Sequence, residues 1–389
     1  MNSILIVAGE NSGEKYGAGL VREFSKLHPQ YRFFGIGGRE MEKAGVERLF
    51  SVEDLAVVGL FEVISHLPRL RRIFGRLVKE AQARRPLAAV LIDSPDFNLR
   101  LAKRLKAAGI PILYFVSPTV WAWRPGRLKK IKETVSKMLL IFPFEKPLYD
   151  RAGIPAVYIG HPLQEYLKVR LRRPAFLRKH GFDPKKKLVT IMPGSRRSEV
   201  LRHMPVLVKA ARLLQEALPV NIAFVLSENL DRGILTSQIP SGLKGTKVLD
   251  RDRYEAVAAG SLVLSACGTA NLEAAMLGRP LIAFYKVSPL TYWAGRRLVR
   301  IRRYSIVNIL AGKDVVPEFI QRRFTPDNVL QEARRLLEDK RAARAQEAEF
   351  KRIRTMMGRK KPSAQAAREL DRLISGRSVK SRSQHAGRK

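Results

Sequence analysis

The sequence of 389 residues predicts an α/β protein with two doubly wound, Rossmann-like domains. Short apolar runs typical of strands alternate with amphipathic stretches typical of helices. The runs contain few polar residues, which indicates strands buried on both faces, in parallel sheets that helices cover on both sides. Pro162 and the basic run Arg170–Arg173 interrupt the alternation, which then starts again. Two such series predict two domains.

The predicted strands form a series of six and a series of five. The first series is Ser3–Ala8, Arg32–Ile36, Ala88–Ile92, Pro111–Val116, Met138–Phe142 and Ala156–Ile159. The second series is Leu188–Met192, Asn221–Leu226, Lys247–Leu249, Leu262–Ser265 and Pro280–Phe284. Ligands of open α/β sheets bind outside the carboxyl ends of the strands. We therefore expect the functional residues in the loops that follow these strands.

Four segments are predicted along the chain. They are a first domain (1–165), a second domain (166–350), a C-terminal helix (351–375) and a tail (376–389). The tail is polar, cationic and without periodicity, so we predict that it is disordered.

The chain is strongly basic, with 73 Lys and Arg against 35 Asp and Glu and a net charge of +38. Such a field attracts nucleic acid or an anionic membrane surface, and it speeds the arrival of anionic substrates. The single cysteine excludes an intramolecular disulfide and agrees with a reducing cytoplasm. The N-terminus has no signal-peptide pattern and no window holds 18 uninterrupted apolar residues, so we expect no cleaved leader and no membrane-spanning helix.

The first predicted domain offers three candidate loops. The glycine-rich loop after the first strand leads into a helix expected from about Lys15, and Asn11, Ser12 and Glu14 could contact a sugar or an anion there, or form an ordinary turn. The loop Ser117–Arg124 contains Trp121 and a second tryptophan, which fit the wall of a sugar or acyl-chain site as well as they fit a core.

The third loop holds two carboxylates, Asp93 and Asp96, at the carboxyl end of a strand. A general base belongs at this position in such a fold. Asp96 could instead cap a helix that starts at Phe97. Asp93 lies nearer the strand and precedes no helix directly, so it is the better candidate for the base.

In the second domain, the strand Leu188–Met192 is followed by Gly194, Ser195 and Arg196 and then by a helix. Backbone amides beside glycine and an arginine fork are suited to a phosphate. The alternative is a solvated arginine. We expect no metal, because no cluster of His, Cys or paired Asp has ligand spacing.

The strand Leu262–Ser265 leads into a turn with three possible nucleophiles, namely Ser265, Cys267 and Thr269. A lone cysteine among small apolar residues is usually an inert packing residue. The more useful feature is the helix that begins at Thr269 after Gly268, because a helix N-terminus carries free N–H groups and about half a positive charge. Glu273, one turn further, suits the hydroxyls of a ribose. Together with the Arg196 loop, this pattern predicts a site for a nucleoside diphosphate.

The segment Ala56–Arg85 is apolar at three- and four-residue steps and rich in arginine, and Pro68 is expected to split it into two helices. A basic amphipathic helix can lie on an anionic bilayer, whereas the alternative is a helix packed on the sheet. The residues expected at a membrane are Val57, Val58, Leu60, Phe61, Ile64, Leu67, Arg69 and Arg72.

Seven segments, in order along nearly the whole folded chain, resemble the lipid-A-disaccharide synthase family. They are GENSGE, IDSPDFN, YFVSPTVWAWR, LIFPFEKPLYDRAGIPAVYIGHPL, LVTIMPGSRRSEV, ACGTANLEAAMLGRPLIAFYK and YSIVNILAGKDVVPEFIQ. Each segment alone is weakly diagnostic, but together they are specific. The sequence departs from the family pattern at Glu14, where aspartate is more typical, and at Cys267-Gly268, where Ser-Gly is usual.

The resemblance implies the glycosyltransferase B architecture, with two domains facing a cleft. It implies transfer of 2,3-diacylglucosamine from its UDP carrier to 2,3-diacylglucosamine 1-phosphate, which gives a β-1,6-linked disaccharide and UDP. By position, Asp93 would be the base, and Ser195, Arg196, Glu273 and Asn308 would lie around UDP. Because the implied substrates carry acyl chains, the resemblance favours contact of the segment 56–85 with a membrane. We therefore expect a cytoplasmic protein that is peripheral to the inner face of the cytoplasmic membrane.

We expect no cofactor and no specific nucleic-acid partner, and a homodimer is compatible with the sequence. Two alternatives remain. One is another UDP-sugar enzyme of the same fold, such as a UDP-N-acetylglucosamine 2-epimerase or a cell-wall glycosyltransferase. The other is a basic nucleic-acid-binding protein, although the sequence shows no recognisable nucleic-acid-binding module.

Overall fold

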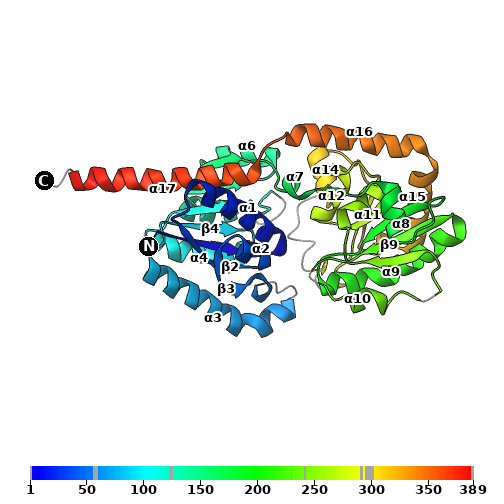
Figure 1. Cartoon of the computed structure of the whole chain (residues 1–389), viewed down its shortest axis with the longest axis horizontal. Coiled ribbons are helices and arrows are strands. Elements are labelled where there is room, and N and C mark those ends of the chain that lie inside the picture. The colour runs from blue at the N-terminus through cyan, green and yellow to red at the C-terminus, as the bar shows by residue number, and fades with distance from the viewer. Residues whose placement is uncertain are drawn as a thin grey trace. The chain divides into compact units, whose positions relative to one another are not determined.

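The computed structural model describes residues 2–55, 60–121, 126–228, 230–240, 242–289, 292–293 and 302–386, without the side chains of 11, 60–66 and 377–386. The chain divides into two compact units (Figure 1), one formed by 1–165 with 359–389 and the other by 166–358. Each unit contains its own sheet and its own hydrophobic core. The two doubly wound domains predicted from the sequence are thereby confirmed.

Within the described residues, the first unit has a seven-stranded parallel sheet of order β3-β2-β1-β4-β5-β6-β7. The strands are β1 (Ser3–Ala8), β2 (Arg32–Gly37), β3 (Val46–Ser51), β4 (Ala88–Ile92), β5 (Ile112–Phe115), β6 (Lys137–Leu140) and β7 (Ala156–Tyr158). The helices are α1 (Asn11–Leu27), α2 (Arg39–Lys43), α3 (Leu60–Arg84), α4 (Pro95–Ala107), α5 (Arg127–Thr134), α6 (Lys146–Arg151), α7 (Leu163–Tyr166) and α17 (Pro362–Ala386), with 3₁₀ turns η1 (Val52–Asp54) and η2 (Pro143–Glu145).

The second unit has a six-stranded parallel sheet of order β10-β9-β8-β11-β12-β13 in its described part. The strands are β8 (Lys187–Met192), β9 (Val220–Val225), β10 (Thr246–Leu249), β11 (Leu262–Ala266), β12 (Leu281–Tyr285) and β13 (Glu318–Ile320). The helices are α8 (Arg173–Lys179), α9 (Arg197–Ala217), α10 (Gly233–Thr236), α11 (Arg253–Ala259), α12 (Thr269–Met276), α14 (Ile306–Ala311), α15 (Pro326–Glu338) and α16 (Lys340–Met357), with η3 (Gln321–Arg323).

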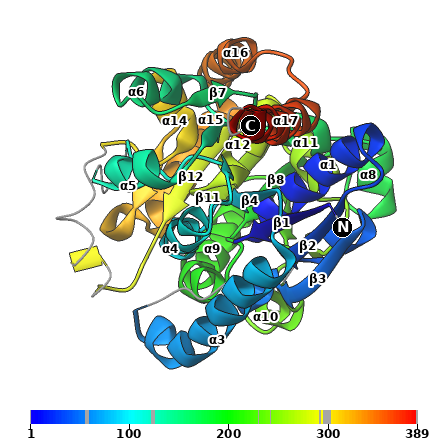
Figure 2. The ribbon, with the colours of Figure 1, turned by 90° about the vertical axis from the view of Figure 1, so that its left-hand side faces the viewer.

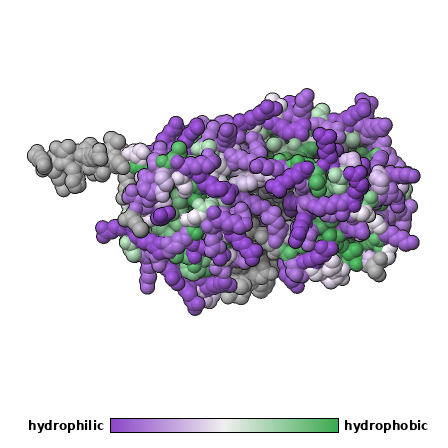
Figure 3. Space-filling model, viewed as in Figure 1, coloured by the Kyte–Doolittle hydropathy of each residue, from purple (hydrophilic) through white to green (hydrophobic). Residues whose placement is uncertain are grey.

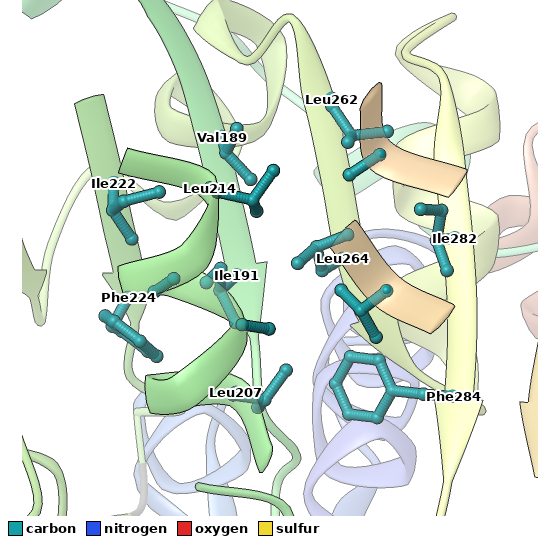
Figure 4. Close-up of a cluster of buried hydrophobic side chains, with 14 of the residues drawn as sticks. Val189, Ile191, Leu207, Leu214, Ile222, Phe224, Leu262, Leu264, Ile282 and Phe284 are labelled. Atoms are coloured by element: carbon teal, nitrogen blue, oxygen red, sulfur yellow. The ribbon is translucent and has the colours of Figure 1, made fainter. Parts of the chain in front are cut away.

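The central strands are buried on both faces because helices cover both sides of each sheet. Every residue of β1, β4 and β11 is buried. In the second unit, Leu207 and Leu214 of α9 pack on side chains from β8, β9, β11 and β12 (Figure 4). This two-sided burial explains why the central strands appear in the sequence as almost uninterrupted apolar runs.

Two edge strands, β3 and β13, were not predicted. β3 has the sequence VERLFS, in which Glu47 and Arg48 are exposed, and it lies at the edge of its sheet. β13 has three residues and lies at the edge of the other sheet. β3 carries exposed charged residues and β13 is only three residues long, so neither shows the apolar run that identifies a buried strand.

Two predicted helix boundaries were wrong. α1 begins at Asn11 rather than near Lys15, so the loop after β1 is short and Ser12 lies in the first turn of the helix. α3 continues through Pro68 instead of being split there. Pro68 is exposed, so water can solvate the backbone carbonyl that loses its hydrogen bond at this position.

The C-terminal helix predicted at 351–375 is in fact parts of two helices. α16 ends at Met357 before Gly358, which has a left-handed φ of 66°, and α17 begins at Pro362. Glycine after a helix and proline at the first helical position are the usual signals for such a break. α17 then continues to Ala386, through most of the tail predicted to be disordered, because extending a packed helix is less costly than nucleating one.

α17 belongs to the first unit although it ends the chain. It packs along α1 (Figures 1 and 2) and buries Ala366, Ala367, Leu370 and Ile374.

The surface matches the charge of the chain, since hydrophilic side chains dominate the face seen in Figure 3. In the part of the chain that the structure describes, no helix is long and apolar enough to cross a bilayer.

Candidate active site

The strand order of each sheet reverses once, between β1 and β4 in the first unit and between β8 and β11 in the second. Doubly wound folds bind ligands at such switch points, because the loops leave neighbouring strands in opposite directions. The four loops that follow β1, β4, β8 and β11, together with the first turns of the helices after them, contain most of the residues predicted for catalysis and for binding UDP and sugar.

The loops after β1 and β4 touch each other. The N–H of Gly9 donates to the carbonyl of Ile92 at 3.0 Å. A Cβ on residue 9 would lie 2.0 Å from the Cβ of Ser94, so only glycine fits at this contact. This brings the start of α1, with Ser12, close to the loop that carries Asp93.

Asp93 is half-buried and lies in a left-handed turn. Asp93 has a φ of 55° and Ser94 a φ of 42°, which is unusual for two consecutive residues other than glycine. The carbonyl of Asp93 accepts from the Tyr114 hydroxyl and from Asn98 Nδ2, both at 2.8 Å, and its N–H donates to Phe115 at 3.0 Å. The carboxylate accepts from the Ser94 N–H at 2.8 Å. Strained turns held in this way are common at active sites.

Asp96 has a different environment from Asp93. It is exposed in the first turn of α4, which begins at Pro95 after Ser94, so the predicted cap of a helix starting at Phe97 is wrong. Its carboxylate accepts from Arg127 Nη2 at 2.5 Å, and Arg127 is buried. A carboxylate oxygen that already accepts from a buried arginine is less available to take a proton from a substrate hydroxyl. These contacts favour Asp93 over Asp96 as the base.

Glu14 has a structural contact that the sequence did not reveal. Its carboxylate accepts from the N–H of Glu40 at 2.7 Å, at the start of α2. A Cβ on Gly38 would lie 2.5 Å from this carboxyl group. Glu14 therefore holds the N-terminus of α2, and the described contacts do not assign it the sugar-binding role predicted from the sequence. Asn11 begins α1, and its side chain lies outside the described part.

Trp121 is held by a buried glutamate that sequence reasoning missed. The indole N–H donates to Glu145 Oε1 at 3.3 Å, and the ring packs edge-to-face on Phe144 with centroids 5.3 Å apart. Glu145 is 1% exposed, and its Oε2 accepts from the Phe142 N–H at 3.2 Å. Burial raises the pKa of Glu145 to about 7, against the opposing effect of its hydrogen bonds. The feature of the sequence that could have identified Glu145 is its position in an aromatic run that follows the strand β6.

In the second unit, the loop after β8 is organised around another missed residue, Glu199. The N–H of Ser195 donates to Glu199 Oε2 at 3.2 Å, and Arg196 Nη1 donates to Oε1 at 2.9 Å. The hydroxyl of Tyr285, at the end of β12, donates to the same Oε1 at 3.0 Å. Two groups predicted to face a diphosphate are thus fixed by one carboxylate.

The loop after β11 holds the three possible nucleophiles. Ser265 is fully buried and donates to the carbonyl of Ala266 at 3.2 Å. Burial raises the pKa of the Cys267 thiol well above its ordinary value, so the thiolate does not form near neutral pH. Gly268 has a φ of 151°, and α12 begins at Thr269. These environments favour the interpretation of this loop as a binding turn.

Glu273 and Asn308 are both buried, but they differ in how many of their polar atoms are already engaged in hydrogen bonds. Arg253 donates to Glu273 Oε2 from Nε at 2.8 Å and from Nη2 at 2.7 Å. Asn308 makes four hydrogen bonds of 2.8 Å, donating to Val316 and Glu318 and accepting from the N–H groups of Val315 and Val316. Asn308 is thereby placed as a support for the Val315–Glu318 loop rather than as the direct UDP contact predicted from the sequence.

The predicted membrane residues are only partly described. Val57 and Val58 lie outside the described residues, and for Leu60, Phe61 and Ile64 only the backbone in α3 is described. Leu67 is half-buried, Arg72 is exposed, and Arg69 is exposed and pairs with Asp54. Further along, Ile73 and Leu77 are buried in the core of the unit. The second half of α3 therefore packs on its own domain.

Within the described ranges, no group of three or more His, Cys, Asp or Glu side chains is placed to hold a metal ion.

Two open parallel sheets with loops at both switch points define the fold as that of the glycosyltransferase B class. The UDP-N-acetylglucosamine 2-epimerase of Neisseria meningitidis, solved with UDP-N-acetylglucosamine, aligns with a TM-score of 0.62 and 11% identity over 96% of this chain and 100% of its own. The calicheamicin glycosyltransferase CalG4 aligns with a TM-score of 0.63 and 14% identity over 96% of this chain and 98% of its own. At these identities the similarity concerns the fold.

Sequence comparison identifies the family. A model of the lipid-A-disaccharide synthetase family matches residues 4–370. The lipid-A-disaccharide synthase of Solibacter usitatus is 39% identical over 377 residues, which cover 97% of this chain and 98% of the relative. That of Trichlorobacter lovleyi is 43% identical over 340 residues, covering 86% and 88%. The chain belongs to the lipid-A-disaccharide synthetase family, and it is a glycosyltransferase of lipid A biosynthesis.

Proposed function

We propose that the chain transfers 2,3-diacylglucosamine from its UDP carrier to the 6-hydroxyl of 2,3-diacylglucosamine 1-phosphate, with inversion at the anomeric carbon. The observation that carries the proposal is the position of Asp93, which is half-buried in a strained turn at the switch point of the first sheet. A single base is what an inverting transfer requires, because the only proton to be removed is that of the acceptor hydroxyl.

In the proposed reaction, Asp93 takes the proton of the 6-hydroxyl as the acceptor oxygen bonds to the anomeric carbon. The bond from that carbon to the diphosphate oxygen breaks at the same time, and UDP leaves with the electron pair. Tyr114 and Asn98, which hold the carbonyl of Asp93, keep the turn in place during this step.

The leaving diphosphate gains negative charge as its bond breaks, and stabilising that charge lowers the barrier. Arg196, the Ser195 loop at Gly194, and the N-terminus of α12 at Gly268 and Thr269 supply positive charge and N–H groups at the switch point of the second sheet. Glu273 is proposed to accept from the ribose hydroxyls. Both bonds from Arg253 end on Oε2, which leaves Oε1 for this contact as far as the described residues show.

The enzymatic test is incubation with UDP-2,3-diacylglucosamine and 2,3-diacylglucosamine 1-phosphate, with detection of UDP and of the disaccharide phosphate. Asp93→Asn should lower kcat by roughly 10²- to 10⁴-fold, the usual contribution of a general base. Asp96→Asn is the matched control and should keep activity within a few-fold. If the control loses activity and Asp93→Asn does not, the base is Asp96.

We further propose that the first half of α3 and the residues before it rest on the anionic inner face of the cytoplasmic membrane. The support is the apolar sequence from Val57 to Leu67 together with exposed Arg72, whereas Ile73 and Leu77 are committed to the core. Replacing Leu60, Phe61 and Ile64 with serine should weaken co-sedimentation with anionic liposomes while the protein stays folded. Unchanged co-sedimentation would count decisively against this surface.

A further inference from the structure

Glu199 lies directly behind the loop proposed to hold the leaving diphosphate, where a negative charge is unexpected. It is 8% exposed in the first turn of α9. A carboxylate beside a diphosphate repels it, so its presence calls for a compensating role.

The Gly194 loop and Tyr285 fix the position of Glu199 from two sides. A Cβ on Gly194 would lie 3.0 Å from both Cβ and Oε2 of Glu199, so the loop closes directly against the carboxylate. Gly194 has a φ of 140°, which only glycine adopts readily, and this allows the close approach. The Tyr285 hydroxyl binds the carboxylate from the end of β12 at 3.0 Å.

The carboxylate in turn fixes the two groups that the reaction needs. It accepts from the Ser195 N–H at 3.2 Å and from Arg196 Nη1 at 2.9 Å. Hydrogen bonds between charged partners are stronger and more directional than neutral ones. Arginine carries its donor hydrogens on a rigid planar group, so the contact from Nη1 to Glu199 orients the whole guanidinium.

His203, one turn further along α9, makes a parallel connection. Its Nδ1 lies 2.6 Å from the carbonyl of Pro193, and its Nε2 lies 3.0 Å from the N–H of Lys286. A carbonyl can only accept and an N–H can only donate, so the imidazole is neutral with its proton on Nδ1. Glu199 and His203 thus connect both sides of the loop 193–196 to the end of β12.

We propose that Glu199 is a positioning residue of the donor site, which orients the Ser195 amide and the Arg196 guanidinium toward the leaving diphosphate. The inference rests on the proposed function, because it takes Arg196 as the group that stabilises that charge. The negative charge weakens donor binding, and in exchange it holds Arg196 in the position needed when the bond breaks.

This trade-off predicts opposite effects on binding and turnover in Glu199→Gln. Removing the charge should leave the donor KM and the Kd for UDP unchanged or lower. Losing the anchor of Arg196 should lower kcat by about 10- to 100-fold, since small misplacements of stabilising groups have effects of this size. A residue with only a structural role would instead lower the melting temperature and weaken UDP binding.

The experiment measures kcat, donor KM, UDP affinity by calorimetry, and melting temperature for the full chain. The variants are Glu199→Gln, Tyr285→Phe and Arg196→Lys, with Glu216→Gln as the control, because Glu216 is an exposed glutamate of the same helix. Tyr285→Phe, which removes one support of the carboxylate, should lower kcat less than Glu199→Gln does. The control should match the parent.

The outcomes separate the inference from the function on which it rests. Parental kcat in Glu199→Gln, or a loss of UDP affinity, would overturn the positioning role. A normal kcat in Arg196→Lys would instead remove Arg196 from the mechanism, whatever Glu199→Gln does. A lower kcat in both variants, with UDP affinity kept in Glu199→Gln, supports the inference.

Discussion

Cys267 illustrates how the surroundings of a single side chain decide its chemistry. Its N–H donates to the carbonyl of Phe284 at 2.9 Å, which fixes the turn between β11 and α12. Burial raises the pKa of its thiol, and the nearby Glu318 carboxylate raises it further. A thiol in this environment is a packing group, because nucleophilic attack requires the thiolate.

Cys267→Ser should therefore keep most of the activity, within about three-fold of the parent, since a turn residue with no role in bond formation can lose its sulfur at little cost. The measurement is the rate of UDP release at saturating donor. Glu273→Gln is the comparison, and it should raise the donor KM through the lost ribose contact. Complete loss of turnover in Cys267→Ser would show that the turn does more than shape a binding site.

Glu145 leads to a prediction about pH. Burial raises its folded pKa to about 7 from an ordinary 4.5, so its contribution to stability is fully present below pH 4.5 and is lost as the pH rises through about 7. The slope can reach about 1.4 kcal/mol per pH unit in this window. His161 acts in the opposite direction, because burial lowers its pKa to about 3 and its contribution is lost as the pH falls below 6.5.

Glu145→Gln should remove the loss of stability between pH 5 and 7.5 while leaving the effect of His161 in place. The free energy of unfolding, measured in urea at several pH values, should then rise more steeply with pH in the variant than in the parent. Trp121 lies next to residue 145 and offers a fluorescence signal of the same region. Parallel curves for the two proteins would mean that Glu145 is ionised throughout.

At the scale of elements, the two units stabilise the turns after β4 and β11 in the same way, with an asparagine from the following helix. Asn98 Nδ2 donates to the carbonyls of Ile92 and Asp93 at 3.1 and 2.8 Å. Asn271 Nδ2 donates to those of Ser265 and Ala266 at 3.3 and 3.1 Å. In both units, an asparagine in the first turns of a helix secures the end of the preceding strand, and both asparagines are fully buried.

This pairing predicts different consequences for the same substitution. Asn98→Ala should lower kcat by about 10-fold with little change in donor KM, because it loosens the turn that carries Asp93. Asn271→Ala should mainly raise the donor KM, because it loosens the turn before α12. Steady-state kinetics with both substrates distinguishes the two. Equal effects on kcat and KM in both variants would show general destabilisation instead.

The central elements could be predicted from the sequence because burial on both faces leaves a direct apolar signal. β1 and β4 coincide with their predicted ranges, and β11 is one residue longer than predicted. The edge strands β3 and β13 lack this signal. Gly358 and Pro362 are residue types that commonly separate two helices. The break was nevertheless missed, because the helical periodicity on either side favoured one continuous helix.

The candidate site was predictable in its loops but less so in its interactions. Position after a strand made Asp93 and Arg196 candidates, and both lie in loops at the switch points of their sheets. The partners of Arg196 and Trp121 depend on which side chains the fold brings together, so Glu199 and Glu145 read as ordinary surface glutamates in the sequence. Asn308 and Glu14 were recognised as significant residues, but their hydrogen bonds support loops and helices of their own units.

At the scale of the whole molecule, the chain returns to its first unit at the end. Lys360 Nζ donates to the carbonyl of Tyr158 at 2.9 Å and lies over that ring, 4.6 Å from its centroid. The N–H of Ser363 donates to Glu165 at 3.1 Å, and His28 of α1 lies 2.8 Å from Asp371. The first unit is therefore completed by residues that follow the second unit in sequence.

A chain that ends at Gly358 should lose stability in the first unit but not in the second. Leu370 and Ile374 are buried by α17, and each contributes roughly 1.5–3 kcal/mol when removed from water. Hydrogen–deuterium exchange should show faster exchange in β1, β2 and α1 of the truncated chain, with unchanged protection in β8, β9 and α9.

UDP affinity should persist, because the groups proposed to bind UDP all lie in the second unit. A chain ending at Gly376 is the control and should exchange like the parent, since it keeps Ala366, Ala367, Leu370 and Ile374, the buried apolar side chains of α17 named above. Unchanged protection of β1 and α1 in the shorter chain would show that the first unit is stable without α17.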